Sequence, residues 1–354
     1  MLLIGLDPAF SAHDPGPGHP ERPARLVAAR SGIEAAGIGD ALAELDVRPA
    51  TIEELTRVHA REMIDRIAAT AEAGGGVFDA DTRASASSWE AARRAAGAGP
   101  AAVEALRAGA GDAAFLALRP PGHHARPSTP MGFCLLNSIA VTAAGLVEAG
   151  ERVAIVDIDA HHGNGTQEIF YDEPSVLYVS LHQWPFYPGT GAYDEIGRGA
   201  GRGATCNVPL PAGATGDVYL HAVDSVVAQR LEDFSPAWLL VSLGVDAHRD
   251  DPLTDLGLSA ADFFGVVERL AAVVPAGRRI AFLEGGYDLD AVRDSLAASL
   301  PALVGARRPT DRARGAIPTI GGPGRETVDA IAAFWQGISE MSRDGASDIG
   351  GARR

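Results

Sequence analysis

Short runs of almost purely apolar residues recur along this 354-residue chain, and they constrain its fold more than any other feature. The clearest of these runs are 113–118, 153–158, 176–181, 238–243 and 280–283. A strand with one solvated face alternates apolar and polar residues, whereas a strand that is apolar throughout is buried on both faces. The runs therefore predict a parallel β-sheet that is covered by helices on both sides.

Segments with helical periodicity separate these runs. We expect helices near 20–37, 84–107, 137–149, 216–231, 259–273, 289–304 and 327–338. Because crossovers between parallel strands are right-handed, alternating strands and helices build a helix layer on each face of the sheet. The expected fold class is α/β, a three-layer α/β/α arrangement with a central, mostly parallel sheet. We expect a single domain over 1–340 and a disordered tail over 341–354.

Charge and cysteine content narrow the class of protein. Thirty basic against 46 acidic side chains give a net charge of −16, so the chain lacks the excess of positive charge typical of nucleic-acid binding. Two cysteines, Cys134 and Cys206, exclude a disulfide framework and favour a reducing cytoplasm. No apolar run reaches the roughly 18 residues of a membrane span. Residues 1–7 are expected to form a first strand, not a signal peptide.

Polar or glycine-rich segments follow four of the predicted strands. These segments are 121–125, 157–166, 244–248 and 284–288. In an open parallel sheet, ligands bind beyond the carboxyl ends of the strands. The four segments together therefore predict one shared site at that edge.

Three residues in these segments have the chemistry of metal ligands. Asp159 and His161 are two positions apart, so on an extended segment both side chains point the same way. Asp246, after a neighbouring strand, can supply a third ligand. Three N/O ligands with one open position are typical of a catalytic zinc site. The alternative is that Asp157 and Asp159 only cap a following helix.

The neighbouring segments carry groups that a metal-dependent hydrolase needs. His123 and His124 are adjacent, and two imidazoles in different environments can act as general base and general acid. Asp157 can orient one of them. The hydroxyl of Tyr287, which follows Gly285 and Gly286, can stabilise a developing oxyanion. The alternative for Tyr287 is a packing role beside the turn.

The assembled motifs resemble those of the histone deacetylase and acetylpolyamine amidohydrolase family, of the bacterial class II-like type. The resemblance covers residues 1–305. It is carried by His13, HPERP at 19–23, RPPGHHA at 119–125, GFCLLN at 132–137, DIDAHHGNGT at 157–166, VSLHQWPFYPGTG at 179–191 and EGGYDL at 284–289. It implies the arginase/deacetylase fold.

The resemblance also implies roles for single residues. One zinc ion would be bound by Asp159, His161 and Asp246. His123 and His124 would flank the reacting water, with His124 as the general base, and Asp157 would pair with His123. Many members pair the other histidine with a second aspartate. Here Asn164 occupies that position, and a neutral amide leaves His124 less cationic. Tyr287 would be the catalytic tyrosine.

Further residues follow from the same resemblance. The substrate-binding residues would be Gly132, Phe133, Tyr187, Leu253, Gly285 and Gly286. A structural potassium ion is expected near Asp157, Asp159, His161, Ser180 and Leu181, mostly through backbone carbonyls. Arg25 would lie near an internal acetate channel. Cys134 is expected to pack in the interior, because its neighbours are apolar. Asp79 and Asp81 are candidates for a carboxylate at the rim of the substrate site that holds the substrate backbone or amine. The alternative is that they cap the helix that follows them.

The implied activity is zinc-dependent removal of acetyl or other short acyl groups from amines such as acetyl-lysine, in the cytoplasm. An acetylpolyamine deacetylase is the first alternative, although Leu253 stands where polyamine-specific relatives carry a glutamate. A two-manganese ureohydrolase is disfavoured, because Gly163 and His248 occupy the positions of its additional carboxylates. A non-catalytic acyl-binding module would require the loss of a site residue, and none is lost. The sequence is compatible with a homo-oligomer.

Overall fold

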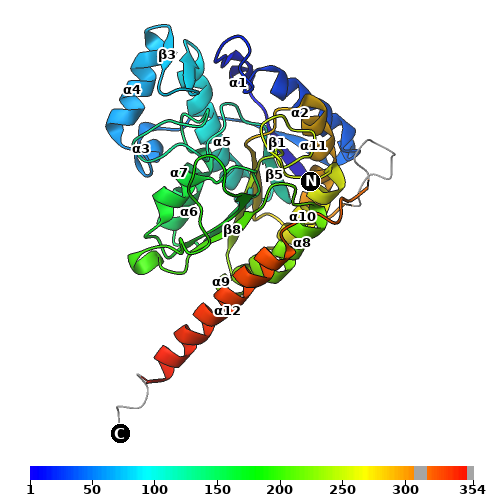
Figure 1. Cartoon of the computed structure of the whole chain (residues 1–354). Coiled ribbons are helices and arrows are strands. Elements are labelled where there is room, and N and C mark those ends of the chain that lie inside the picture. Colours follow the sequence, from blue (N-terminus) through cyan, green and yellow to red (C-terminus); the bar gives the residue numbers. More distant parts are fainter. Residues whose placement is uncertain (307–316, 349–354) are drawn as a thin grey trace.

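The computed structural model describes residues 1–306 and 317–348 (Figure 1). Its main sheet is built from β1 (Leu2–Gly5), β2 (Leu42–Leu45), β5 (Ala113–Leu116), β6 (Val153–Asp157), β7 (Val176–Gln183), β8 (Thr205–Leu210), β9 (Trp238–Leu243) and β10 (Arg279–Leu283). The eight strands are all parallel, in the order β2-β1-β5-β10-β9-β6-β7-β8. Every residue of β5, β6, β7 and β9 is buried, as their apolar runs predict, and every residue of β8 is buried as well.

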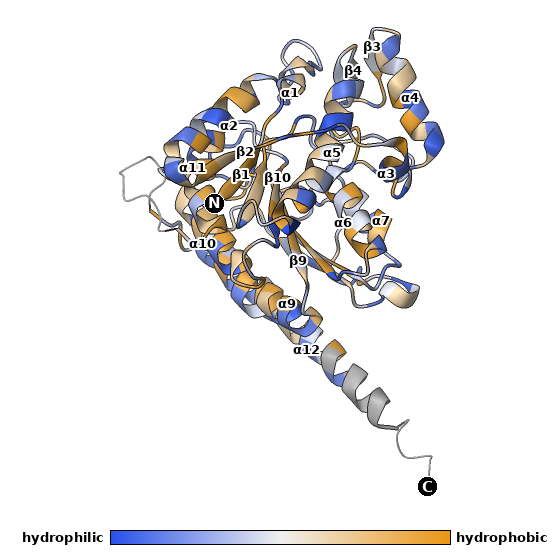
Figure 2. Ribbon diagram, turned by 180° about the vertical axis from the view of Figure 1, so that it is seen from behind, coloured by the Kyte–Doolittle hydropathy of each residue, from blue (hydrophilic) through white to orange (hydrophobic). Residues whose placement is uncertain are grey.

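Helices cover both faces of this sheet. The α-helices of the described residues are α1 (Pro8–Ala12), α2 (Ala24–Ala35), α3 (Ile52–Thr56), α4 (Arg61–Glu72), α5 (Ser88–Arg107), α6 (Ser138–Glu148), α7 (Asn164–Phe170), α8 (Gly216–Ala222), α9 (Ala228–Phe234), α10 (Ala260–Ala271), α11 (Leu289–Leu303) and α12 (Arg325–Asp348). Figures 1 and 2 show α2, α10 and α11 on one side of the sheet and α3, α5 and α6 on the other. The predicted three-layer α/β/α fold is confirmed.

Some element boundaries differ from those predicted. The early helix begins at Ala24 rather than near 20, because Pro20 and Pro23 precede it. The edge strands β2 and β8 were not predicted, because their sequences, LAEL and TCNVPL, mix polar with apolar residues. Helix α5 begins at Ser88, and a small antiparallel pair, β3 (Gly75–Val77) and β4 (Arg83–Ser85), lies before it.

The C-terminal helix is longer than predicted. Helix α12 continues to Asp348, past the expected end near 338 and into the segment expected to be disordered. Its buried residues Val328, Ile331 and Trp335 recur at helical spacing and pack against the core. Residues 349–354 lie outside the described part of the chain. Within the described residues, no helix is both long and apolar enough to cross a membrane.

Candidate active site

The carboxyl ends of four adjacent strands bring the predicted site residues together. Strands β5, β10, β9 and β6 are neighbours in the sheet, so the segments that follow them meet at one edge. These segments carry His123 and His124, Tyr287, Asp246, and Asp159 with His161. The site is thus assembled from residues that are far apart in the sequence.

The three predicted zinc ligands converge in the interior. The Nδ1 atom of His161 lies 2.8 Å from Oδ2 of Asp246 and 3.2 Å from Oδ1 of Asp159. Ligand atoms of all three side chains lie within 4.8 Å of one another. A nitrogen and two carboxylate oxygens form a donor set that suits zinc. The residues present therefore fit the predicted metal.

Backbone amides and two glycines hold the carboxylates in place. The amide of Gly285 donates to Oδ2 of Asp159 and that of Ala160 to Oδ1 of Asp246, both at 2.7 Å. A Cβ atom on Gly285 would lie 2.4 Å from Oδ2 of Asp246, and one on Gly244 would lie 2.1 Å from Oδ2 of Asp159. Only glycine therefore leaves room for both carboxylates to face the ligand position.

The electrostatics of this trio favour a cation. Burial raises the pKa of Asp246 to about 7, and the negative charge of Asp159 contributes in the same direction. Burial lowers the pKa of His161, but the charge of Asp246 and hydrogen bonds to both aspartates outweigh it and raise the pKa to about 10. Without an ion, a proton on His161 neutralises part of the negative charge. A divalent metal would replace that proton.

The adjacent histidines lie in different environments. The Nδ1 atom of His123 is 3.0 Å from Oδ2 of Asp157, and that of His124 is 2.8 Å from Oδ1 of Asn164. Burial lowers the pKa of His123, but the charges of Asp159 and Asp157 raise it overall to about 10. Burial and the positive charge of His123 hold the pKa of His124 well below its usual value. The two rings therefore differ in their affinity for a proton.

Aromatic rings surround the approach to these histidines. The ring of Tyr187 packs edge-on against His124 with 5.3 Å between centroids, and Phe133 packs edge-on against Tyr287 at 5.7 Å. A Cβ atom on Gly132, whose φ is +56°, would lie 2.4 Å from the His124 ring. Gly132 and Tyr187, two of the expected substrate-binding residues, therefore lie against His124, and Phe133, a third, lies against Tyr287.

The loop that carries Tyr287 is fixed by an aspartate that the sequence analysis did not single out. Asp251 accepts hydrogen bonds from the amide of Tyr287 at 2.7 Å and from that of Leu253 at 3.0 Å. It thereby joins the segment after β9 to the segment after β10. The sequence feature that could have identified Asp251 is its position directly before Pro252, in a run of polar residues.

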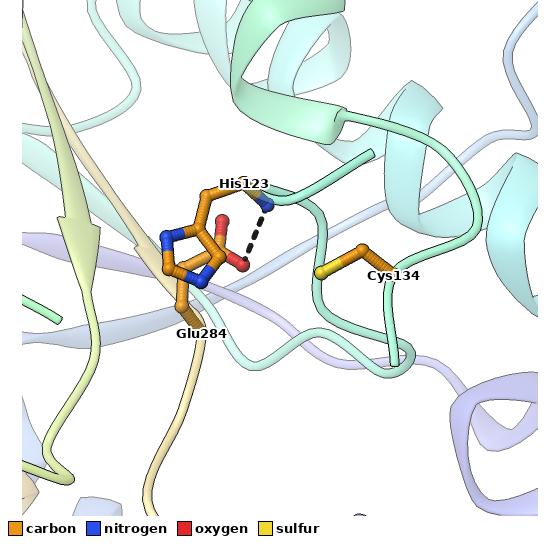
Figure 3. Close-up of side chains that lie close together, drawn as sticks. All are labelled: His123, Cys134 and Glu284. Atoms are coloured by element: carbon orange, nitrogen blue, oxygen red, sulfur yellow. Dashed lines mark hydrogen bonds between the residues drawn. The ribbon is translucent and has the colours of Figure 1, made fainter. Parts of the chain in front are cut away.

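Figure 3 shows a second cluster of potential ligands, His123, Cys134 and Glu284. Here Oε2 of Glu284 already accepts from the amide of His123 at 3.1 Å, and the Cys134 thiol donates to the Gly132 carbonyl at 3.3 Å. Burial raises the pKa of Cys134 well above its usual value, so the thiol stays protonated. The cluster with two aspartates is therefore the better metal site, and Cys134 is buried as expected.

The residues expected around potassium also lie together. Asp157 in β6 lies opposite Ser180 in the register of the neighbouring parallel strand β7. The hydroxyl of Tyr219 donates to the carbonyls of Leu181 at 3.0 Å and Ile158 at 3.2 Å. Backbone carbonyls and a carboxylate are oxygen ligands of the kind that alkali ions bind.

Asp79 and Asp81 lie in the segment between β3 and β4. Oδ1 of Asp79 accepts from the amides of Asp81 at 3.1 Å and Thr82 at 2.7 Å. Neither aspartate caps α5, which begins only at Ser88. The hydroxyl of Thr82 accepts from the amide of Phe133 at 3.1 Å, so this segment contacts one of the expected substrate-binding residues.

A buried cluster of three charged side chains, Glu21, Arg25 and Arg119, packs against the active site. The sequence analysis assigned a position only to Arg25. The guanidinium of Arg25 lies 5.0 Å from the Tyr287 ring centre and donates to Oε1 of Glu21 at 3.1 Å. Arg119 donates to Oε2 of the same glutamate at 2.7 Å. All three charged side chains are fully buried. Two positive charges thus share one carboxylate, and one of them, that of Arg25, lies over the Tyr287 ring.

The charge of Glu21 is expected to be essential for stability. We expect Glu21→Gln to lower the free energy of unfolding by about 3–5 kcal/mol, because two buried guanidiniums lose their counter-charge. Denaturant unfolding measures this effect. The matched control is Asp65→Asn, which breaks the exposed pair with Arg61 and should cost less than about 1 kcal/mol. Equal effects of the two substitutions would contradict the assigned role.

The same cluster predicts a direction of pH dependence. Burial raises the pKa of Glu21, but a hydrogen bond from His13 and the charge of Arg119 outweigh it and hold the pKa well below its usual range. Its stabilisation is therefore complete above the unfolded pKa of about 4.3 and is lost as the pH falls towards the folded pKa. Glu21→Gln should accordingly flatten the acid side of the stability profile.

Comparison with known proteins places the chain in a family. The histone deacetylase domain matches residues 19–303. A probable deacetylase from Archaeoglobus fulgidus is 38% identical over 287 residues, covering 79% of this chain and 80% of the relative. A histone deacetylase-like amidohydrolase from Pseudomonas aeruginosa is 40% identical over 276 residues, covering 76% and 73%. The crystal structure of the HDA15 HD domain superposes with a TM-score of 0.87 at 34% identity, over 100% of this chain and 99% of that one. The chain belongs to the histone deacetylase family.

Proposed function

We propose that this protein is a zinc-dependent amidohydrolase that removes acetyl or other short acyl groups from amines such as the side chain of acetyl-lysine. The observation that carries the proposal is the convergence of Asp159, His161 and Asp246 beside a histidine pair and a tyrosine. The relatives named deacetylase and amidohydrolase support the same reaction class.

The metal and the protein would contribute different parts of the chemistry. A zinc ion held by Asp159, His161 and Asp246 would supply a Lewis acid for the amide carbonyl and would acidify a water molecule. The chain supplies the groups that move protons. His124 donates its Nδ1 proton to Asn164, so its Nε2 atom is free to accept a proton from the attacking water.

The remaining residues act on the tetrahedral intermediate. The Tyr287 hydroxyl donates a hydrogen bond to the oxyanion that forms from the carbonyl oxygen. A protonated histidine of the pair then delivers a proton to the departing nitrogen, and the C–N bond breaks. Asp157 orients His123 through its Nδ1 atom. The products are a carboxylic acid and a free amine, and no covalent intermediate with the enzyme is required.

We also propose a structural potassium ion between β6 and β7. Its ligands would be backbone carbonyls of this region together with the Asp157 carboxylate and Ser180. The pairing of Asp157 with Ser180 supports this assignment. An ion there would support the strand end that leads to Asp159 and His161.

Leu253 leads us to expect that acetyl-lysine is hydrolysed at least as well as acetylated polyamines. Its side chain is partly exposed and cannot pair with a second ammonium group of a polyamine. We expect kcat/KM for an acetyl-lysine peptide to be at least equal to that for N-acetylspermidine or N-acetylputrescine, with acetate release as the readout. A tenfold preference for N-acetylspermidine, about 1.4 kcal/mol, would favour the acetylpolyamine alternative. Hydrolysis of no acylated amine in a broad panel would refute the proposed enzyme.

A further inference from the structure

A cavity of about 380 Å³ lies between the segment after β9 and the beginning of α11. Its polar lining consists of four aspartates, a histidine and an arginine: Asp250, Asp288, Asp290, Asp294, His248 and Arg249. The two segments also carry Asp246 and Tyr287, so the cavity lies at the same edge of the sheet as the active site. Neither the family match nor the proposed mechanism gives this cavity a role.

The cavity has an excess of negative charge. Arg293 pairs with Asp290 at 2.7 Å and with Asp294 at 2.8 Å, and Arg249 is the other cation nearby. Four aspartates against these two arginines leave two negative charges in excess. The side chains of Asp250 and Asp290 are 66% and 76% exposed, so they are accessible to a ligand.

A buried histidine adds an unused hydrogen-bond donor. His248 is only 4% exposed, and its Nδ1 atom accepts from the amide of Asp250 at 3.2 Å. Because Nδ1 is the acceptor, the neutral ring carries its proton on Nε2. Within residues 1–306 and 317–348, no hydrogen bond involves that Nε2 atom. A ligand in the cavity can supply the missing acceptor.

The walls of the cavity are fixed without a ligand. The amide of Asp251 donates to the His248 carbonyl and that of Arg249 donates to the Leu258 carbonyl, both at 2.9 Å. On the other wall, Oδ1 of Asp288 accepts from the amide of Ala291 at 2.8 Å and caps α11. Binding therefore requires little ordering of the protein.

We propose that this cavity binds a basic residue of a peptide, with its guanidinium or ammonium group at Asp250 and Asp290 and a backbone carbonyl at Nε2 of His248. Carboxylates recognise the cation, and the histidine N–H recognises the peptide carbonyl, which a simple polyamine lacks. Resting on the proposed function, the inference is that the enzyme prefers acyl-lysine in a peptide that also carries a basic residue.

The first test measures binding without catalysis. The probe is the unacetylated tripeptide Gly-Arg-Gly amide, titrated calorimetrically into the metal-loaded protein whose active site is occupied by a hydroxamate inhibitor. We expect binding that is weakened about tenfold by the double substitution D250N/D290N and also by H248F. Citrulline in place of arginine should weaken it similarly. Spermidine bound as tightly as the tripeptide would overturn the assignment to a peptide.

The second test measures substrate selection. Acetyl-lysine peptides carry arginine or citrulline at each position in turn, and the ratio of their kcat/KM values is the readout. We expect a ratio of about ten at one position, equal to ~1.4 kcal/mol, and a fall to about one in D250N/D290N. The control D65N removes an exposed, arginine-paired aspartate from α4 and should leave the ratio unchanged.

The two tests separate the failure of the inference from that of the proposed function. A ratio of one at every position in the wild-type enzyme would overturn selection by a basic residue. If the protein hydrolyses no acylated amine but still binds the tripeptide through Asp250 and Asp290, the proposed function fails and the binding site stands.

Discussion

Replacing Asp246 with asparagine is expected to remove the bound zinc and to reduce hydrolysis to background. An asparagine is nearly isosteric with aspartate, so the fold should be retained while an anionic ligand is lost. Two remaining ligands leave the donor set one short of the three that a catalytic zinc site uses. Metal content per chain and acetate release measure the two losses in the same preparation.

The stability of the variant tests the same site without an activity assay. In the metal-free protein, the charge of Asp159 helps to raise the pKa of Asp246, which shows that the two carboxylates repel each other. Removing one charge should therefore leave the metal-free protein at least as stable as the wild type. A metal at a thousand times its dissociation constant adds about 4 kcal/mol to the wild type only. Chelation should lower the wild-type Tm and leave that of Asp246→Asn unchanged.

A second buried carboxylate provides the control. Asp262 is fully buried and accepts hydrogen bonds from the amide and hydroxyl of Ser259, both at 2.8 Å, where it helps to cap α10. Asp262→Asn should reduce stability and keep its zinc. Zinc retained at full occupancy by Asp246→Asn, or two metal ions bound between Asp159 and Asp246, would contradict the proposed centre.

The site residues that directly follow strands could be predicted from the sequence, because local sequence patterns mark where the strands end. Each apolar run ends in a polar segment, and parallel strands bring such segments to one edge. The two-residue spacing of Asp159 and His161 places both side chains on one side of an extended segment. The convergence with Asp246 then depended only on β6 and β9 being neighbours in the sheet.

The ion pair between Glu21 and Arg119 in the buried charge cluster could not be predicted in this way. Glu21 and Arg119 are 98 positions apart and meet only because the chain folds, and no local periodicity marks either as a partner of the other. The edge strand β8 was missed for a related reason. Its residue Asn207 is buried through contacts with Gln167, 40 positions away, so its burial comes from tertiary structure and not from apolar character.

Replacing Tyr287 with phenylalanine is expected to lower kcat by about 10²–10³ while changing KM little. A donor to an oxyanion contributes most when negative charge develops on the carbonyl oxygen, so its loss raises the barrier more than it weakens substrate binding. The phenyl ring itself should stay in place. It packs edge-on against Phe133 at 5.7 Å and beneath the guanidinium of Arg25 at 5.0 Å, and neither contact uses the hydroxyl.

Three measurements make this prediction specific. Metal content and Tm should match the wild type, which separates loss of the donor from loss of the site. Tyr193→Phe is the control, because Tyr193 is 47% exposed and packs on Phe334 at 5.3 Å, so its hydroxyl should be dispensable. A rise in KM with unchanged kcat would instead make the Tyr287 hydroxyl a ground-state contact. In that case the oxyanion would have to be stabilised without this hydroxyl, and the proposed role of the tyrosine would be wrong.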